Sequence, residues 1–424
     1  MTILQIKDFS CIHFAAIDIA ACTIFIGEQA SGKSVVSKLM YFFGDIIFKK
    51  VFEENEIIDI HSFRELIEQD FLLWFPTSAW GEKKFQITYQ AGEIFISLER
   101  KITRRKVASL LDIQLSSSLI AFFHEYKEAV AKAESEINKT PNLDDNPFRR
   151  FSLLSSIESQ YRDVLRADAE KDYISWQLFI PAGRSFFTSF GKAITAFERS
   201  RMLDPITMRF GEFYLNAKQR KTSKAIVFPR VKIDQELSEI MQVFFGGNLV
   251  NKKDEEYIST RDGRMIPVAY LSSGQQELLP LWQSIEEIVN YRSGDYVIYI
   301  EEPEAHIFPS TQSSIVEYLS AYLVNKNKNS RVVLTTHSPY VLAKFNNLLK
   351  AGIVGRKRGK SQRVAEIVGR DSWLPAGSVA AYTIVNGVAK SIMGDDYLID
   401  AEYLDSVSGV ISEEYMKLVE VEIG

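Results

Sequence analysis

The sequence has little cysteine and no long apolar run. Its 424 residues include two cysteines, Cys11 and Cys22, which excludes a disulfide-rich secreted scaffold and favours a reducing, cytoplasmic location. No apolar run reaches the roughly 18 residues that cross a membrane, and charged side chains interrupt the apolar N-terminus. We therefore expect neither a signal peptide nor a membrane partner. With 46% hydrophobic and 25% charged residues, the composition is that of a globular protein.

The net charge of −5 is unevenly distributed along the chain. Residues 391–424 carry a net −8, which leaves the other 390 residues at +3. This acidic tail is a candidate docking segment or a solvated helix. Three basic islands interrupt the rest of the chain, and together they favour a nucleic acid or a polyanionic phage protein as partner, although each alone is typical of a solvated loop. The islands are Arg100–Lys106, Lys218–Lys224 and Arg356–Lys360.

The pattern of apolar residues predicts an α/β core. A strand at 23–26 leads into a glycine-bearing loop and then a helix from Val35. Short β-branched runs at 297–300 and 332–335 are typical of buried parallel strands. Between them lie mostly helical patterns, so we predict a P-loop NTPase head split by a helical insertion. The predicted regions are 1–105 (ATPase lobe), 106–254 (helical insertion), 255–345 (second ATPase lobe) and 346–424 (C-terminal extension with the acidic tail).

The first motif matches the pattern GxxxxGK[ST] in full. Its glycines let backbone N–H groups face phosphate oxygens, Lys33 reaches the terminal phosphates, and the Ser34 hydroxyl ligates Mg²⁺. The position between an apolar strand and a helix makes an ordinary glycine turn a poor alternative. The residues expected to bind ATP are Gly27, Glu28, Gln29, Ala30, Ser31, Gly32, Lys33 and Ser34.

Two adjacent carboxylates end the apolar run at 297–300. We expect Glu301 to lie near the metal and Glu302 to polarise a water aimed at the γ-phosphate. A solvated strand end is the alternative. Many such sites carry Asp at the first position, and the longer arm of Glu301 alters the metal geometry.

Two further motifs are compatible with phosphate binding. Leu271–Glu277 reads as a helix start, and its free N–H groups form either an ordinary capped terminus or an anion site. His337 ends the second apolar strand between hydroxyl residues and a proline. A lone histidine is more often structural, but this placement makes His337 a candidate hydrogen-bond donor to the γ-phosphate.

The order of these motifs resembles the ATP-binding-cassette (ABC) ATPases. Within them the chain is similar to the branch of RecF, Rad50 and the structural-maintenance-of-chromosomes heads, and to the overcoming-lysogenization-defect (OLD) proteins. The string EEPEAHIFP over Glu301–Pro309 is close to the EEPEAHLHP form of OLD-like ATPases. The resemblance covers residues 1–105 and 255–345 well, and the insertion and tail only loosely.

The resemblance implies a site shared between two heads. The heads would pair head to tail, as a homodimer or within a higher oligomer, and trap two molecules of ATP with Mg²⁺. Glu302 would be the catalytic carboxylate, His337 the switch histidine, and His306 part of the loop between the two sites. The signature residues that would meet the γ-phosphate from the other head are Ser272, Ser273, Gly274 and Gln275.

The family also implies a glutamine that contacts the metal, and three candidates stay open: Gln86, Gln90 and Gln177. The stretch Leu178–Arg184 resembles an IPAxR element of the OLD-like group and is a candidate for the same place. This puts Arg184 near the nucleotide.

Some parts of the OLD nucleases are missing. The 85 residues after Pro339 leave little room for a Toprim nuclease domain, and Asp395-Asp396 lacks its metal-binding spacing. The resemblance therefore implies an ATP-hydrolysing sensor or assembly subunit of a bacterial anti-phage system, like those of PARIS, Septu and retron-linked modules, which controls a separately encoded effector nuclease. A RecF-like DNA-repair ATPase and an ATP-dependent scaffold with little turnover stay open as alternatives.

Overall fold

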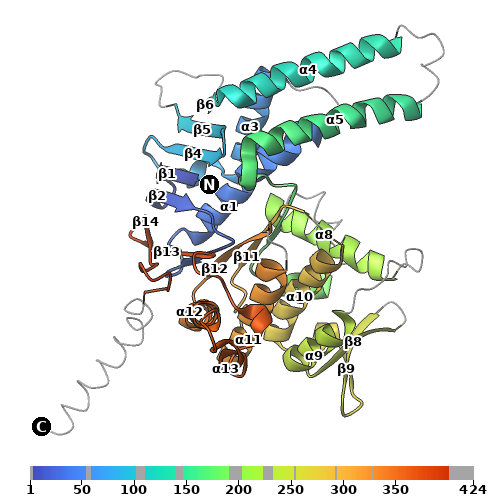
Figure 1. The fold of residues 1–424 in the computed structure, drawn as a ribbon. Coiled ribbons are helices and arrows are strands. Elements are labelled where there is room, and N and C mark those ends of the chain that lie inside the picture. Colours follow the sequence, from blue (N-terminus) through green and yellow to red (C-terminus); the bar gives the residue numbers. More distant parts are fainter. Residues whose placement is uncertain are drawn as a thin grey trace, which may run out of the picture.

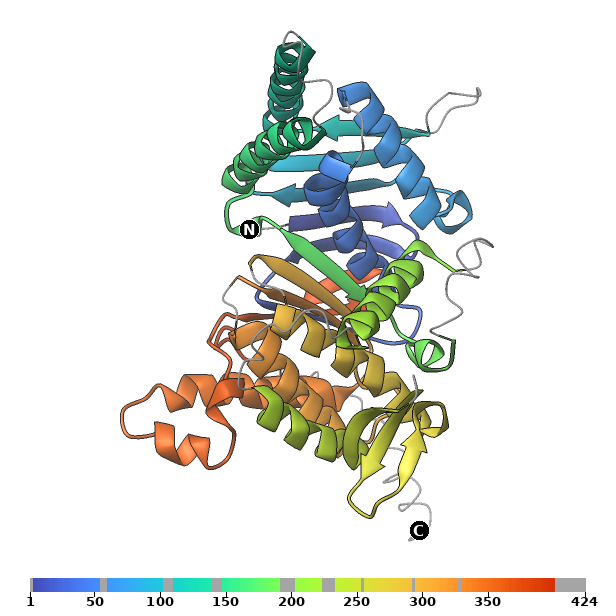
Figure 2. The same ribbon diagram turned by 90° about the vertical axis from the view of Figure 1, so that its right-hand side faces the viewer.

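The computed structural model describes residues 3–53, 59–101, 110–138, 147–190, 203–222, 233–252, 255–291, 294–326 and 329–400. These residues form an eleven-stranded sheet with helices on both faces, together with a smaller three-stranded sheet (Figures 1 and 2). Among them, no helix is long and apolar enough to cross a membrane.

The large sheet joins an antiparallel half to a parallel half. Strands β1, β2, β4, β5 and β6 pair antiparallel, whereas β13, β3, β12, β11 and β7 run parallel to one another. Across the sheet the order is β6 (Leu111–Leu115), β5 (Ile94–Arg100), β4 (Gln86–Ala91), β1 (Ile3–Phe9), β2 (Ile12–Asp18), β14 (Val388–Ser391), β13 (Val379–Val385), β3 (Cys22–Ile26), β12 (Arg331–Thr336), β11 (Tyr296–Glu301) and β7 (Trp176–Ile180).

The central parallel strands are buried on both faces. Alternate residues of β11 enter different cores, Val297 and Tyr299 one of them, Ile298 and Ile300 the other. This explains why the strands read as continuous apolar runs. The first core includes α1 (Lys33–Asp45) and α3 (Ile60–Trp74), and the second includes α10 (Ser273–Tyr291), α11 (Pro309–Leu319) and α12 (Pro339–Gly355).

The region predicted as a helical insertion contributes to the large sheet. Strand β6 extends its antiparallel half, and β7 forms its parallel edge beside β11. Both strands join the sheet because they carry apolar side chains that are buried there. The helices of this region are α4 (Ser117–Asn138) and α5 (Pro147–Ala169), which lie side by side (Figure 1), then α6 (Ser185–Phe190), α8 (Pro205–Thr222) and α9 (Ile233–Phe245). The small sheet follows, with β8 (Gly247–Lys252), β9 (Glu255–Thr260) and β10 (Met265–Pro267).

The region predicted as a C-terminal extension also enters the large sheet. Strand β13 pairs parallel with β3, and β14 pairs with β2, so the two strands join the two halves of the sheet. The apolar sequence of Val379–Val385 explains this burial. The acidic tail from residue 401 lies outside the described residues. Shorter helical segments are η1 (Ile46–Lys50), α2 (Val51–Glu53), η2 (Thr77–Ala79), η3 (Glu170–Asp172), η5 (Val268–Tyr270), η6 (Ser320–Asn325), α13 (Ser361–Ala365) and η7 (Arg370–Ser372).

Candidate functional site

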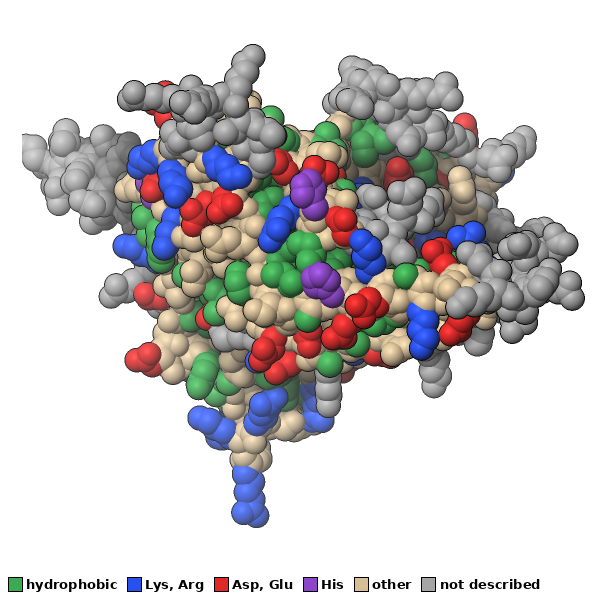
Figure 3. Space-filling model, turned by 90° about the horizontal axis from the view of Figure 1, so that it is seen from above, with side chains coloured by type: hydrophobic (Ala, Val, Ile, Leu, Met, Phe, Trp, Pro, Cys, Tyr) green, Lys and Arg blue, Asp and Glu red, His purple; other side chains and the backbone are tan. Residues whose placement is uncertain are grey.

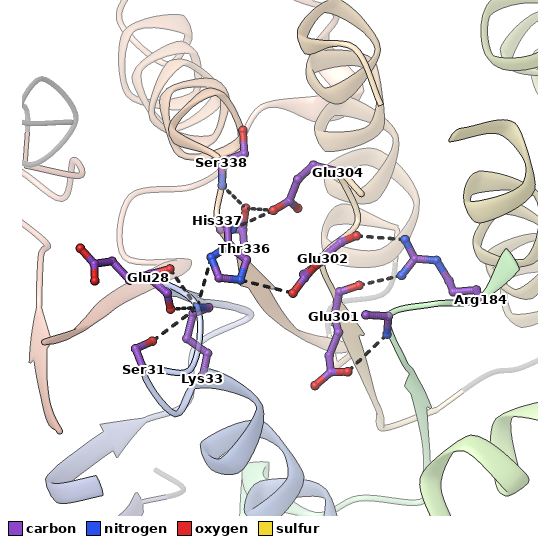
Figure 4. Close-up of polar contacts among 12 residues, drawn as sticks. Glu28, Ser31, Lys33, Arg184, Glu301, Glu302, Glu304, Thr336, His337 and Ser338 are labelled. Carbon is purple, nitrogen blue, oxygen red and sulfur yellow. Dashed lines mark hydrogen bonds and ion pairs between the residues drawn. The ribbon is translucent and has the colours of Figure 1, made fainter. Parts of the chain in front are cut away.

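Four parallel strands end at the same edge of the sheet. In register, Ile26 lies beside Thr336, Thr335 beside Glu301, and Ile300 beside Ile180. The loops that follow these strands therefore meet, and they bring the phosphate loop, the two glutamates and His337 together (Figure 4). Open α/β sheets bind ligands at this carboxyl edge.

The backbone of the phosphate loop requires its glycines. Gly27 has a φ of 154° and Gly32 a φ of 106°, both in the range that side chains disfavour. A Cβ atom on Gly32 would also lie 2.4 Å from Ile12 Cδ1. The loop is therefore shaped for glycine at these positions, and four other predicted ATP-binding residues are exposed along it: Glu28, Gln29, Ala30 and Ser34.

The ammonium of Lys33 lies inside the loop. It donates to the carbonyl oxygens of Gly27 at 2.8 Å and Glu28 at 2.7 Å, and to Ser31 Oγ at 3.4 Å. Burial lowers the pKa of Lys33, while the carboxylates of Glu302 and Glu304 oppose this shift. A cation with these weak neutral partners is well suited to exchange them for phosphate oxygens.

His337 connects Lys33 to the second glutamate. Its Nδ1 lies 3.5 Å from Lys33 Nζ and its Nε2 3.3 Å from Glu302 Oε1. Because an ammonium group only donates, His337 Nδ1 is the acceptor, and Nε2 carries the proton shared with Glu302. The structure thus joins three predicted catalytic residues in one chain of polar contacts (Figure 4).

Glu301 has the properties of a metal ligand. Its side chain is largely buried, and its Oε2 accepts a hydrogen bond from Ala182 N at 3.3 Å. Its Oε1 is buried without a hydrogen-bond partner. A buried carboxylate oxygen without a partner is costly unless a cation binds it, and carboxylates are ligands that Mg²⁺ uses. The residues present therefore fit Mg²⁺, with Glu301 and the exposed Ser34 as the candidates to hold it.

Glu302 adopts a left-handed backbone conformation, with a φ of 43°. Non-glycine residues rarely adopt this conformation, and it is often found at functional sites. Its N–H donates to Thr335 O at 2.9 Å, while its carbonyl accepts from Arg184 Nη2 at 3.0 Å. The turn directs the partly exposed carboxylate of Glu302 to His337 (Figure 4).

Glu304 holds the loop that carries His337, a role that the sequence analysis did not assign. Its Oε1 accepts from Thr336 Oγ1 and from His337 N, both at 2.7 Å. Gln312 adds a second connection, because its Oε1 accepts from Ser338 Oγ at 2.6 Å. The EEPEAH string could have identified Glu304 as a site residue from the sequence, whereas Gln312 belongs to no recognisable motif.

Arg184 lies behind the two glutamates and is fully buried. Its guanidinium donates to the backbone carbonyls of Glu301 at 2.6 Å and Glu302 at 3.0 Å. Burial lowers the pKa of Arg184, and the carboxylate of Glu277 leads the opposing charges. The prediction placed Arg184 near the nucleotide; the structure gives it contacts with the backbone that presents Glu302, on the side away from solvent.

The signature segment forms the capped N-terminus of α10. Gln275 N lies 3.4 Å from Ser272 Oγ, and Gln275 Oε1 accepts from Ser272 N at 3.2 Å, which is the geometry of a capping box. A Cβ atom on Gly274 would lie 2.4 Å from His306 O, so the glycine allows α10 to pack against the loop after β11. Ser272, Ser273 and His306 are exposed, and within the described residues no hydrogen bond or ion pair joins Ser272–Gln275 to the phosphate loop.

The three glutamine candidates lie away from this edge. Gln86 and Gln90 belong to β4, and four strands separate β4 from β3. Gln177 lies beside Val297 near the start of β11, and it donates to Tyr41 O at 2.8 Å. In this structure Ala182 N, from the loop after β7, donates to the carboxylate of Glu301.

In two of the basic islands, three of the described cations have partners within the chain. Arg100 donates to two backbone carbonyls, and residues 102–106 are outside the described residues. In the second island Lys218 pairs with Glu256 at 2.5 Å and Arg220 with the buried Glu287 at 2.7 Å. These two cations hold α8 to its neighbours.

One family model matches most of the chain. The family model described as AAA ATPase domain matches residues 1–342, which confirms the predicted α/β P-loop ATPase fold. The comparison with curated proteins gives no match.

Three solved structures show a distant likeness. An Smc head bound to the C-winged helix domain of ScpA is 14% identical, with 92% of this chain and 96% of that chain covered and a TM-score of 0.42. The SMC head domain from Thermotoga maritima is 14% identical, with 92% and 98% covered and a TM-score of 0.37. The Smc head with an extended coiled coil, bound to the C-terminal domain of ScpA derived from Pyrococcus furiosus, is 11% identical, with 98% and 100% covered and a TM-score of 0.39. These TM-scores are low, and no conclusion rests on them.

Proposed function

This chain belongs to the AAA ATPase domain family, and from that premise we propose that it hydrolyses ATP in a site that a second copy of the chain completes. The observation that carries the proposal is the contact chain from Lys33 through His337 to Glu302 at the carboxyl edge. A phosphate-binding cation, a switchable donor and a carboxylate base are the groups that phosphoryl transfer to water needs.

Each residue has a defined task in this proposal. Lys33 exchanges its carbonyl partners for the terminal phosphates of ATP, and Glu302 takes the proton of the attacking water. Without ATP, His337 donates through Nε2 to the Glu302 carboxylate, and when ATP binds it turns this one donor to the γ-phosphate. Ser34 and Glu301 would hold Mg²⁺, which when bound supplies charge neutralisation for the phosphates.

We propose a second copy because, within the described residues, no hydrogen bond or ion pair joins Ser272–Gln275 to the phosphate loop of the same chain. Ser272 and Ser273 are exposed at the start of a 19-residue helix, where backbone N–H groups favour an anion. Three large aromatic side chains beside the motifs are also exposed: Tyr270 before the signature, Phe308 after His306, and Tyr340 after His337. Such side chains beside polar motifs are typical of a surface that another molecule covers.

The variant Glu302→Gln tests this proposal. It keeps the size of the side chain but removes the base, so we expect hydrolysis to fall by about 10²–10⁴-fold while ATP still binds. The trapped ATP complex should then elute as a dimer in size-exclusion chromatography with light scattering. Wild-type turnover in Glu302→Gln would contradict the assignment, and wild-type biological function without turnover would favour the scaffold alternative.

We propose further that the ATPase controls a separately encoded effector nuclease in an anti-phage system. Support comes from the likeness of Glu301–Pro309 to OLD-like ATPases and from the acidic segment after Asp400 as a docking candidate. Co-purification with the product of the adjacent gene, with and without residues 401–424, tests this. No nuclease in the neighbouring gene and no co-purified partner would contradict it.

A second candidate, a DNA-linked ATPase like RecF, is favoured by the third basic island. The C-terminal end of α12 and helix α13 project from the body, and basic side chains gather on a projecting tip (Figures 2 and 3). Among the described residues no ion pair engages this group, which we call the α12–α13 basic tip. Its exposed members are Lys350, Arg356, Lys357, Arg358, Lys360, Arg363 and Arg370.

Unpaired cations on one projection suit the phosphate backbone of a nucleic acid. We expect the chain to bind duplex DNA with an affinity that falls steeply with salt. Replacing Arg356, Lys357 and Arg358 by Gln should lower the salt slope by about 0.9 for each lost phosphate contact. Salt-independent binding, or an unchanged slope in the triple variant, would exclude this surface; Lys83→Gln on the opposite lobe is the control.

A further inference from the structure

Arg184 donates hydrogen bonds to the backbone of the turn that carries Glu302, the proposed catalytic carboxylate. Its Nη1 donates to Glu301 O at 2.6 Å and to Pro181 O at 3.1 Å, while Nη2 donates to Glu302 O at 3.0 Å. The planar guanidinium thus spans two consecutive carbonyls in a fixed geometry that a lysine cannot reproduce.

The same arginine is held by α10, the helix that begins at the signature. Arg184 Nε donates to Glu277 O at 3.0 Å, and Arg184 N donates to Glu277 Oε2 at 3.0 Å. The other carboxylate oxygen, Oε1, accepts from Ser185 N at 3.2 Å and from Ser185 Oγ at 2.7 Å. Both ionic side chains are buried, Arg184 fully and Glu277 at 3% exposure. The loop after β7 is therefore fixed to the first turns of α10.

The turn at Glu302 depends on these contacts. A residue with a φ of 43° keeps that conformation only when its surroundings hold it. Thr335 O accepts the Glu302 N–H on one side, and Arg184 donates to the Glu302 carbonyl on the other. A displacement of Arg184 would therefore re-aim the carboxylate that His337 contacts.

We propose that Arg184 and Glu277 are a positioning pair. When an ATP phosphate binds at the signature end of α10, this pair couples the movement of the helix start to the backbone of Glu302. Ser272 caps α10, and Glu277 lies five positions later within the helix, so a shift of the helix start moves the Glu277 carboxylate with it. The connection runs in order from Ser272 through Glu277 and Arg184 to Glu302. It makes hydrolysis in one chain depend on whether that chain's signature is engaged, and it rests on the proposed function above.

The test separates positioning from binding and from folding. We expect Arg184→Lys to lower kcat by about 30-fold with less than about threefold change in KM for ATP, because small misplacement of a catalytic group costs that much. Arg331→Lys is the matched control. Arg331 is also a buried arginine, with a carboxylate partner and carbonyl acceptors, but at the opposite edge of the sheet. Its kcat should stay within about twofold of the wild type.

A double-variant cycle measures whether the kcat losses of two substitutions are coupled. A merely structural role of Arg184 would give no such coupling with Ser272. If Arg184 transmits the state of the signature, Arg184→Lys combined with Ser272→Ala should lose no more kcat than the more severe single variant. Ser272→Ala combined with Arg331→Lys should instead show the product of the two single effects. Multiplicative losses in both cycles would overturn the inference.

Glu277→Gln is the second variant, should Arg184→Lys fail to fold. The amide keeps the shape of the side chain but cannot accept from both N–H groups, so we expect the same kcat loss and the same non-additivity with Ser272→Ala. A wild-type chain without any ATP turnover would overturn the proposed function and this inference with it. Turnover in the wild type with unchanged kcat in Arg184→Lys and Glu277→Gln would overturn this inference alone.

Discussion

The two edges of the parallel strands each contain a buried arginine beside a carboxylate, yet they differ in what the arginine holds. At the amino edge, Arg331 pairs with Asp172 at 3.2 Å and also donates to two backbone carbonyls of the segment before β7. At the carboxyl edge, Arg184 with Glu277 holds the turn of Glu302, whose side chain is 38% exposed. The same pair of residue types thus joins backbone segments at one edge and, at the other, holds the turn that carries a partly exposed carboxylate.

The comparison teaches that burial of a charge does not by itself mark function. The carboxyl edge differs in the partners of its buried charged groups: the Lys33 ammonium donates to neutral groups, and Glu301 Oε1 has no hydrogen-bond partner. Substitutions at the two edges should therefore affect different measured quantities, activity at one and stability at the other.

Lys33→Ala should have the largest effect. It removes the cation that meets the terminal phosphates, so we expect ATP turnover to fall by at least about 10²-fold in a phosphate-release assay. Lys38→Ala, further along α1, is the control and should keep wild-type turnover. Comparable turnover in Lys33→Ala and the wild type would contradict the proposal that the phosphate loop binds the ATP that is hydrolysed.

Glu304→Ala should have an intermediate effect. It deletes the acceptor shared by Thr336 Oγ1 and His337 N, so the loop of His337 loses its anchor. We expect kcat to fall about tenfold, with ATP affinity nearly unchanged. Glu317→Ala, on the far end of α11, is the control. If ATP affinity fell in Glu304→Ala and kcat did not, Glu304 would act on binding rather than on His337.

Asp172→Asn should have the smallest effect on activity. Breaking the buried pair with Arg331 should lower the free energy of unfolding by about 3 kcal/mol in urea titrations, because it leaves a buried cation poorly compensated. The kcat of the folded fraction should stay at the wild-type value. A loss of kcat without loss of stability would contradict the distinction between the two edges.

The sequence predicted much of the site but little of what holds it together. The phosphate loop is continuous, and Glu301, Glu302 and His337 each follow an apolar strand, so local pattern was enough to find them. Arg184 contacts Glu277 and Glu302 across 93 and 118 positions, and no local pattern encodes such pairings. For the same reason the entry of β7 and β13 into the large sheet was missed.

The most direct test of the central claim mixes two inactive variants, Lys33→Ala and Ser272→Arg. Each lacks one half of the composite site, but a mixed dimer has one site with an intact phosphate loop and an intact signature. Random pairing makes half of the dimers mixed and a quarter of all sites complete, so we predict more ATP turnover than the two variants show separately. A quarter of wild-type turnover is the upper limit, because the Glu302 of the complete site belongs to the chain whose own signature is altered. A mixture that hydrolyses no more ATP than the two variants measured separately would contradict the claim that a second copy completes the site.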